Sequence, residues 1–153
     1  MNNNMQPVVS IITPTYNILK SGRKESLVKT IQSVRKQTYG KIEHLIIDGG
    51  SNDGTLEFLN EIGEGLRIIS EPDKGLYDAM NKGVRNACGE FILILNSDDS
   101  FIDDEAIEVS VNAIIESGAD FSYAKARCVD AYGMETPMPN CYAPDIEHIF
   151  LEM

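Results

Sequence analysis

Several features that assign a chain to a common class are absent from this sequence. Its 153 residues contain no run close to the ~20 apolar residues that span a bilayer. Residues 1–7 lack the apolar core of a secretory signal and read as a disordered tail. The three cysteines, Cys88, Cys128 and Cys141, show no C-x-x-C spacing, and an odd number argues against a disulfide framework. We therefore expect a cytoplasmic protein without a transmembrane segment.

Positive charge is also scarce. The chain has 13 Lys and Arg residues against 24 Asp and Glu residues, which gives a net charge of −11. A nucleic-acid partner bound through its phosphates is not expected, because such binding needs many basic side chains. An acidic protein that handles phosphates usually takes positive charge from a metal ion or from a few placed Lys or Arg residues. The hydrophobic fraction of 42% is ordinary for one globular domain.

Two common nucleotide-binding motifs are missing as well. The segment Thr13-Pro14-Thr15-Tyr16-Asn17 contains no glycine, so it cannot be a G-x-G-x-x-G fingerprint. The chain also has no G-x-x-x-x-G-K-[ST] phosphate loop. This segment instead offers Tyr16, whose ring could stack on a planar base. The alternative is a ring packed between a sheet and a helix.

The hydrophobic pattern predicts alternating strands and helices. Strands are expected at 8–13, 42–48, 66–70, 91–95 and 119–129, and helices at 25–37, 55–62, 76–87 and 103–117. Pro14 is expected to end the first strand. The unbroken apolar run 91–95 indicates a strand buried on both faces. The alternation predicts an α/β fold, a mostly parallel central sheet with helices on both faces.

Ligands of such folds bind at the carboxyl ends of the strands. This rule groups the loops 14–19, 48–55 and 96–100, with 71–75 nearby. In the third loop, Asp98 and Asp99 follow the apolar strand directly. Two carboxylates about 5 Å apart repel by roughly 3 kcal/mol at an effective dielectric constant of about 20. A divalent cation would remove this repulsion, whereas the alternative is a solvated turn.

The other loops at this edge carry further candidates. Asp48 could accept a hydrogen bond from a base N–H or a ribose hydroxyl, and the Gly49-Gly50 pair would let the backbone approach a ligand. Lys74 is the nearest basic candidate for a diphosphate oxygen. Asp53 and Thr55 are expected to serve a turn and the start of a helix.

Four segments occur in a specific order: 9–17 (VSIITPTYN), 47–55 (IDGGSNDGT), 75–83 (GLYDAMNKG) and 96–99 (NSDD). Together they resemble the family 2 glycosyltransferases of the GT-A fold, in the bacterial polysaccharide-assembly branch. The resemblance implies a Rossmann-like domain at 8–129 that binds a nucleoside-diphosphate sugar. It also implies that 130–153 begin the acceptor-side region, and that the chain is truncated before the family's usual catalytic base.

The resemblance implies roles for the matching residues. Tyr16 would stack on the base of the donor, beside the Pro14 backbone. Asp48 would contact the nucleoside, and Asp98 would meet the ribose. Asp99 would ligate Mn²⁺ or Mg²⁺ that bridges the diphosphate.

The implied reaction moves a sugar, from a UDP-sugar in the first place, to a hydroxyl of a saccharide or lipid-linked saccharide acceptor. It proceeds with inversion and needs a carboxylate base. Gly49 departs from the family pattern, because many members carry a second acid there that contacts uracil. Asp145, Glu147 and His148 are ionisable but none is favoured as the base, so the catalytic residues are unassigned.

Two alternative functions are weighed, and the location and the oligomeric state stay open. The chain could be a non-catalytic nucleotide-sugar-binding module, since it ends before the usual base. Another α/β phosphate-handling enzyme is disfavoured, because such enzymes keep acids or glycines where this chain has Pro14 and Tyr16. Action at the inner face of the membrane is expected by analogy, and exposed strand edges could pair two copies into a homo-oligomer.

Overall fold

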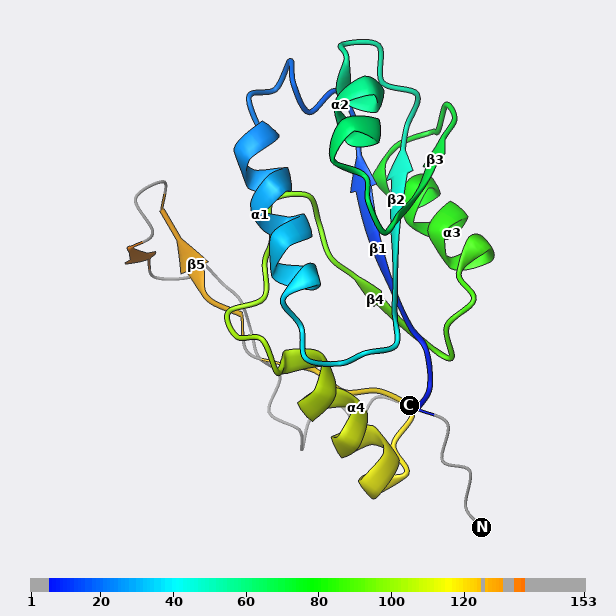
Figure 1. Cartoon of the computed structure of the whole chain (residues 1–153), viewed down its shortest axis with the longest axis vertical. Helices are drawn as coiled ribbons and strands as arrows, with labels where there is room; N and C mark the ends of the chain where they lie inside the picture. Colours follow the sequence, from blue (N-terminus) through cyan, green and yellow to red (C-terminus); the bar gives the residue numbers. More distant parts are fainter. Residues whose placement is uncertain (1–5, 125, 131–133, 137–153) are drawn as a thin grey trace. The chain divides into compact units, whose positions relative to one another are not determined.

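The computed structural model describes residues 6–124, 126–130 and 134–136. The chain forms two compact units, residues 1–112 and 113–153. In the first unit, four parallel strands form one sheet in the order β3-β2-β1-β4 (Figure 1). The strands are β1 (Val9–Thr15), β2 (Ile42–Asp48), β3 (Leu66–Ser70) and β4 (Phe91–Ile94). The helices are α1 (Lys24–Arg35), α2 (Thr55–Ile62), α3 (Leu76–Asn86) and α4 (Ala106–Ser117).

Helices cover both faces of this sheet, as the sequence predicts. Successive strand residues point to opposite faces, so Ile11 packs in a core cluster with Val34 of α1, while Ile12 packs with Ala79 of α3. Figure 1 shows α1 and α3 on opposite sides of the strands. The α/β fold with a mostly parallel sheet is therefore confirmed.

The helix α3 lies unusually close to the sheet. A Cβ atom at Gly83 would be 2.3 Å from Cγ2 of Ile12, so only glycine allows this approach. A glycine inside a helix costs about 1 kcal/mol relative to alanine. Here the close contact with a fully buried strand residue offsets that cost.

The prediction that Pro14 ends the first strand is wrong. β1 continues through Pro14, which pairs with Ile47 of β2. The oxygen of Ile12 accepts from Leu95 N on the β4 side, and the oxygen of Thr15 accepts from Gly49 N on the β2 side. By alternation, the nitrogen of Pro14 points to the β4 side, beyond the last β1–β4 pair. A missing N–H costs no ladder hydrogen bond there.

The prediction that the strand at 91–95 is buried on both faces is also wrong. β4 is the last strand of the described sheet, and Ile92 is 45% exposed. An apolar run cannot distinguish a central strand from an edge strand, because the neighbours of a strand are set by the topology.

The predicted strand at 119–129 is mostly absent. Only β5 (Cys128–Val129) forms, and it pairs antiparallel with β6 (Glu135–Thr136). Phe121 and Tyr123, which lie within the predicted strand, are exposed. Alternating apolar residues form a strand only where a neighbouring strand supplies hydrogen bonds, and none does so within the described residues.

The predicted domain limits, 1–7, 8–129 and 130–153, stay predictions. Residues 1–5 and most of 130–153, with the base candidates Asp145, Glu147 and His148, lie outside the described residues. In the part of the chain that is described, no helix has the length and apolar character to cross a membrane.

A buried histidine makes the stability of the first unit depend on pH. His44 of β2 is 5% exposed, and its Nε2 lies 3.0 Å from Thr13 Oγ1. Its Nδ1 has no hydrogen-bond partner among the residues described. Burial lowers the pKa of His44 from 6.5 to about 4, and the positive charge of Arg35 adds to this effect.

We expect the free energy of unfolding to fall as the pH decreases from 6.5 to 4. In this range the unfolded chain binds a proton at His44 that the folded chain does not bind, which is worth up to about 3 kcal/mol. The variant His44→Gln should remove this part of the slope. Urea unfolding of both proteins between pH 7 and 4.5 measures it, and parallel pH profiles would contradict the prediction.

Candidate functional site

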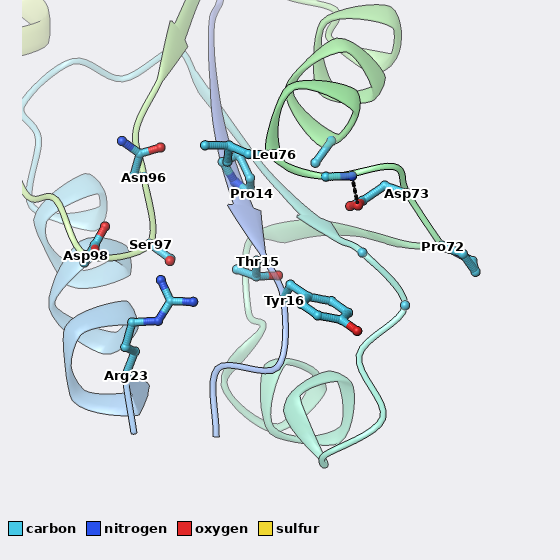
Figure 2. Close-up of a pocket in the computed structure, with 14 residues that line it drawn as sticks. Pro14, Thr15, Tyr16, Arg23, Pro72, Asp73, Leu76, Asn96, Ser97 and Asp98 are labelled. Atoms are coloured by element: carbon cyan, nitrogen blue, oxygen red, sulfur yellow. Dashed lines mark hydrogen bonds between the residues drawn. The ribbon is translucent and has the colours of Figure 1, made fainter. Parts of the chain in front are cut away.

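One pocket of about 800 Å³ lies at the carboxyl ends of the parallel strands (Figure 2). Residues from all four loops that the sequence grouped contribute to its lining. They are Pro14, Thr15, Tyr16, Arg23, Gly49, Gly50, Pro72, Asp73, Gly75, Leu76, Ala79, Asn96, Ser97 and Asp98. This volume suits a ligand with the size of a nucleotide or a small cofactor.

The carboxylate of Asp48, at the end of β2, is buried and links three strands. It is 0% exposed and is not among the lining residues. Its Oδ2 accepts from Ser51 N at 2.9 Å and from Ser70 Oγ of β3 at 2.7 Å. Its Oδ1 accepts from Ser51 Oγ and, at 3.4 Å, from Thr15 Oγ1 of β1. The structure gives Asp48 a positioning role, and its direct contact with a nucleoside stays a prediction.

The loops after β1 and β2 hold each other through backbone N–H groups and side-chain oxygens. Asn17 N donates to Ser51 Oγ at 2.8 Å, and Ile18 N donates to Thr55 Oγ1 at 2.9 Å. Lys20 N donates to Asp53 Oδ2 at 2.7 Å. Asp53 and Thr55 therefore have the structural role that their turn-forming character predicts.

Tyr16 directly follows the last residue of β1 and lines the pocket. Its side chain is 56% exposed, so the ring is not packed between the sheet and a helix. Thr15 lies beside it in Figure 2, and Pro14, further back along β1, also lines the pocket. An open aromatic face is therefore available in the pocket, and its stacking on a base stays a prediction.

The loop after β4 is both a turn and part of the pocket wall. Asp99 N donates to Asn96 O at 3.1 Å, which closes the turn, and Asn96 Nδ2 donates to Asp99 Oδ2 at 2.9 Å. Both carboxylates are exposed, but only Asp98 is a lining residue. Asp99 follows this lining residue in the chain, and its backbone carbonyl oxygen accepts from Thr30 Oγ1 of α1 at 2.7 Å.

The charged side chains in the pocket are Arg23, Asp73 and Asp98. Arg23 is the residue before α1, and its Nε donates to Ser21 Oγ at 3.0 Å. In Figure 2 its guanidinium group points toward the loop of Ser97 and Asp98, whereas Asp73 lies by the start of α3, away from Arg23 and Asp98. The side-chain charges of the lining therefore sum to −1.

Comparison with known proteins identifies the family. The sequence matches the description "Glycosyl transferase family 2" over residues 10–148. The chain belongs to glycosyl transferase family 2. An uncharacterized glycosyltransferase of Mycobacterium tuberculosis is 40% identical to it over 114 residues, which are 73% of this chain and 42% of that protein. A PGL/p-HBAD biosynthesis glycosyltransferase of Mycobacterium bovis is 39% identical over 105 residues, 66% of this chain and 39% of that protein.

Solved structures agree with this assignment. S. aureus TarS in complex with UDP-GlcNAc has a TM-score of 0.62 and 26% sequence identity, over 74% of this chain and 32% of that one. The predicted GT-A-like fold of the family 2 domain is thus confirmed. This family 2 chain spans about two fifths of the length of the mycobacterial relatives it matches.

The oxygen atoms of the 96–99 loop of this family 2 protein suit a hard divalent cation. Asp98 and Asp99 offer exposed carboxylates, and Asn96 Oδ1 is buried without a hydrogen-bond partner among the described residues. Within the described ranges, no group of three or more His, Cys, Asp or Glu side chains could hold a metal alone. Mg²⁺ is commonly held by one or two carboxylates together with substrate phosphates. The donor set fits such a shared site.

Arg23 and Asp73 were missed as pocket residues in the sequence. The first loop was expected to end at residue 19, although Arg23 follows it just before a predicted helix, where a basic side chain could have been noticed. Asp73 stands in a charged loop that reads as solvated. Lys74, the predicted basic candidate, is exposed and outside the lining, and its N donates to Asp78 Oδ2 at 3.0 Å. Its contact with a diphosphate stays a prediction.

We expect Asp48→Ala to destabilise the first unit strongly. The substitution leaves Ser51 and Ser70 donors without their charged acceptor inside the protein. Hydrogen bonds to charged groups are worth about 1.5–3 kcal/mol each, and the loss of three such bonds is partly offset because the cost of burying the carboxylate disappears too. A net loss of about 2–4 kcal/mol in the free energy of unfolding is expected. Urea unfolding at pH 7 measures it. Asp104→Ala, at an exposed carboxylate, is the control, and an equal loss in both variants would contradict the prediction.

Proposed function

We propose that this protein is a glycosyltransferase that uses a nucleoside-diphosphate sugar, in the first place a UDP-sugar. The sugar would pass to a hydroxyl of a saccharide or lipid-linked saccharide acceptor, with inversion. The observation that carries the proposal is the pocket itself. It combines the exposed ring of Tyr16 with Arg23 and with the acidic loop after β4, whose oxygen atoms suit a divalent cation. TarS, which has the same fold, was solved in complex with UDP-GlcNAc and with UDP.

Each part of the pocket would serve one part of the donor. Tyr16 would stack on the base beside the Pro14 backbone, and Asp98 would accept from a ribose hydroxyl. Arg23 would face the diphosphate, with Lys74 at the edge of the site. Asp48 would keep the ends of the three strands in place beneath the nucleoside.

The charge of the pocket supports a metal ion as a further component. A diphosphate is strongly anionic, and a lining with a net charge of −1 would repel it. We propose Asp99 as the carboxylate that holds Mn²⁺ or Mg²⁺. When bound, such an ion stabilises the leaving diphosphate as a Lewis acid. The residues of this chain would orient the donor and keep its anomeric carbon open to the acceptor.

A carboxylate base for the acceptor hydroxyl is not assigned to any residue. A non-catalytic nucleotide-sugar-binding module is therefore the second candidate. Release of UDP from a UDP-sugar by the intact protein, in the presence of a saccharide acceptor, would favour the enzyme. Tight donor binding without any turnover would favour the module. A location at the inner face of the membrane and pairing of two copies stay predictions.

The metal assignment predicts different effects for the two neighbouring acids. Asp99→Ala should abolish the Mn²⁺-dependent part of UDP binding, so that the affinities with Mn²⁺ and with EDTA become equal. Asp98→Ala should weaken binding in both buffers, because a ribose contact needs no metal. Isothermal titration calorimetry of the intact protein measures both.

Asp104→Ala serves as the control in the same titrations, because it removes an exposed carboxylate outside the pocket. An unchanged response to Mn²⁺ in Asp99→Ala would rule out the metal role of this residue. If the unmodified protein bound no nucleoside diphosphate in any buffer, the proposed function itself would be wrong.

The stacking role of Tyr16 predicts a selective loss of affinity. Tyr16→Ala should weaken UDP binding by about 1–3 kcal/mol, the usual contribution of a base stacked on an aromatic ring. Tyr16→Phe should retain most of the affinity, because the ring face is preserved. Tyr77→Ala is the matched control, since Tyr77 is 79% exposed and does not line the pocket. Equal affinities of Tyr16→Ala and Tyr77→Ala would refute stacking.

A further inference from the structure

A carboxylate occupies the space beside Gly49, the residue that follows Asp48 at the end of β2. A Cβ atom at Gly49 would lie 2.5 Å from Oδ2 and 3.0 Å from Cγ of Asp73. The backbone of Gly49 is outside the left-handed region, so its conformation would accept a side chain. The nearest atoms to a side chain at residue 49 would therefore be those of the Asp73 carboxylate.

The loop that carries Asp73 is held against the two glycines. A Cβ atom at Gly50 would lie 3.1 Å from Pro72 N, so this second glycine also admits the loop. Lys82 Nζ donates to Pro72 O at 2.6 Å. Gly75 N donates to Asp73 Oδ1 at 2.8 Å, the dashed line in Figure 2. One oxygen of Asp73 is thus fixed, and the other, Oδ2, is directed to the space over Gly49.

The lining separates two kinds of surface around Tyr16. Arg23 and Asp98 lie together at one end of the lining (Figure 2). A charged group and a metal ion would be accommodated there. Asp73 lies away from them, by the start of α3, and lines the same pocket. A base stacked on Tyr16 would then direct its polar edge toward one of these two sides. The diphosphate would take the side of the arginine, which leaves the side of Asp73 for the edge of the base.

We propose that Oδ2 of Asp73 reads the polar edge of the donor's base and sets the base preference of this protein. This inference rests on the proposed function and deepens it. An ionised carboxylate only accepts hydrogen bonds. Uracil, thymine and guanine carry a ring N–H on their Watson–Crick edge, whereas cytosine and adenine carry a ring nitrogen lone pair at the corresponding place. Asp73 therefore selects the first three bases and disfavours the last two.

The test compares UDP with CDP, because these ligands differ only at this edge of a pyrimidine. The intact protein should bind UDP about 10- to 100-fold more tightly than CDP in calorimetry with Mn²⁺, the range expected for one hydrogen bond to a charged group. In Asp73→Asn, the amide oxygen can keep the bond from Gly75 N. Its NH₂ group then takes the place of Oδ2, where it can donate to N3 of cytosine. The ratio of the UDP and CDP affinities should fall to about one or invert.

Two further variants separate the contact from charge and from folding. Glu71→Gln removes the same charge from an exposed position in the same loop, outside the lining, and should leave the ratio unchanged. The double variant Gly49→Asp, Asp73→Ala moves the carboxylate to the neighbouring backbone position. It should restore the UDP preference that Asp73→Ala alone loses.

The outcomes distinguish this inference from the proposed function. Binding of UDP with the same UDP-to-CDP ratio in Asp73→Asn as in the unmodified protein would overturn the inference and leave the proposed function intact. Failure of the double variant to regain a UDP preference over Asp73→Ala would also overturn it. An unmodified protein that binds neither ligand would overturn the proposed function and the inference together.

Discussion

The buried carboxylate of Asp48 is the interaction on which the pocket depends. Removing an ionised group from water costs several kcal/mol unless hydrogen bonds replace the lost hydration. Ser51 and Ser70 supply these bonds, and Thr15 adds a longer one. Because the donors come from three strand ends, satisfying one carboxylate fixes β1, β2 and β3 relative to one another. The loops that follow these strands carry lining residues, so the positions of those residues depend on the same hydrogen bonds.

Glycines that allow segments to pack closely then determine which residues line the pocket. Gly83 lets α3 lie directly on Ile12, which places the start of α3 at the rim of the site. Gly49 and Gly50 admit the loop of Pro72 and Asp73. From the sequence, Gly49 and Gly50 were predicted to let the backbone approach a ligand closely. In the structure, the loop of Pro72 and Asp73 occupies the space beside these glycines. This loop adds the carboxylate of Asp73 to the pocket lining, whereas Gly49 contributes no side chain.

Local patterns were sufficient for most of the secondary structure and insufficient at the sheet edges. The elements at 42–48, 55–62 and 66–70 have the bounds that apolar spacing and turn residues indicate. Pro14 was misjudged because the cost of a missing N–H depends on which neighbour that side of the strand faces. β4 and the segment 119–129 were misjudged for a related reason. Whether an apolar strand is central, at an edge or unpaired depends on residues far away in the chain.

The sequence by itself determined the fold class, the family and the loops that meet at one edge of the sheet. Hydrophobic periodicity and parallel topology depend on residue type and order, which are visible in a single chain. Only the tertiary structure decided which side chains of these loops are buried and which line the pocket. The side chain of Asp48 is buried and outside the lining, whereas Arg23 and Asp73 line the pocket. Burial and direction result from contacts between distant segments, such as that of Gly49 with Asp73, and local sequence does not encode them.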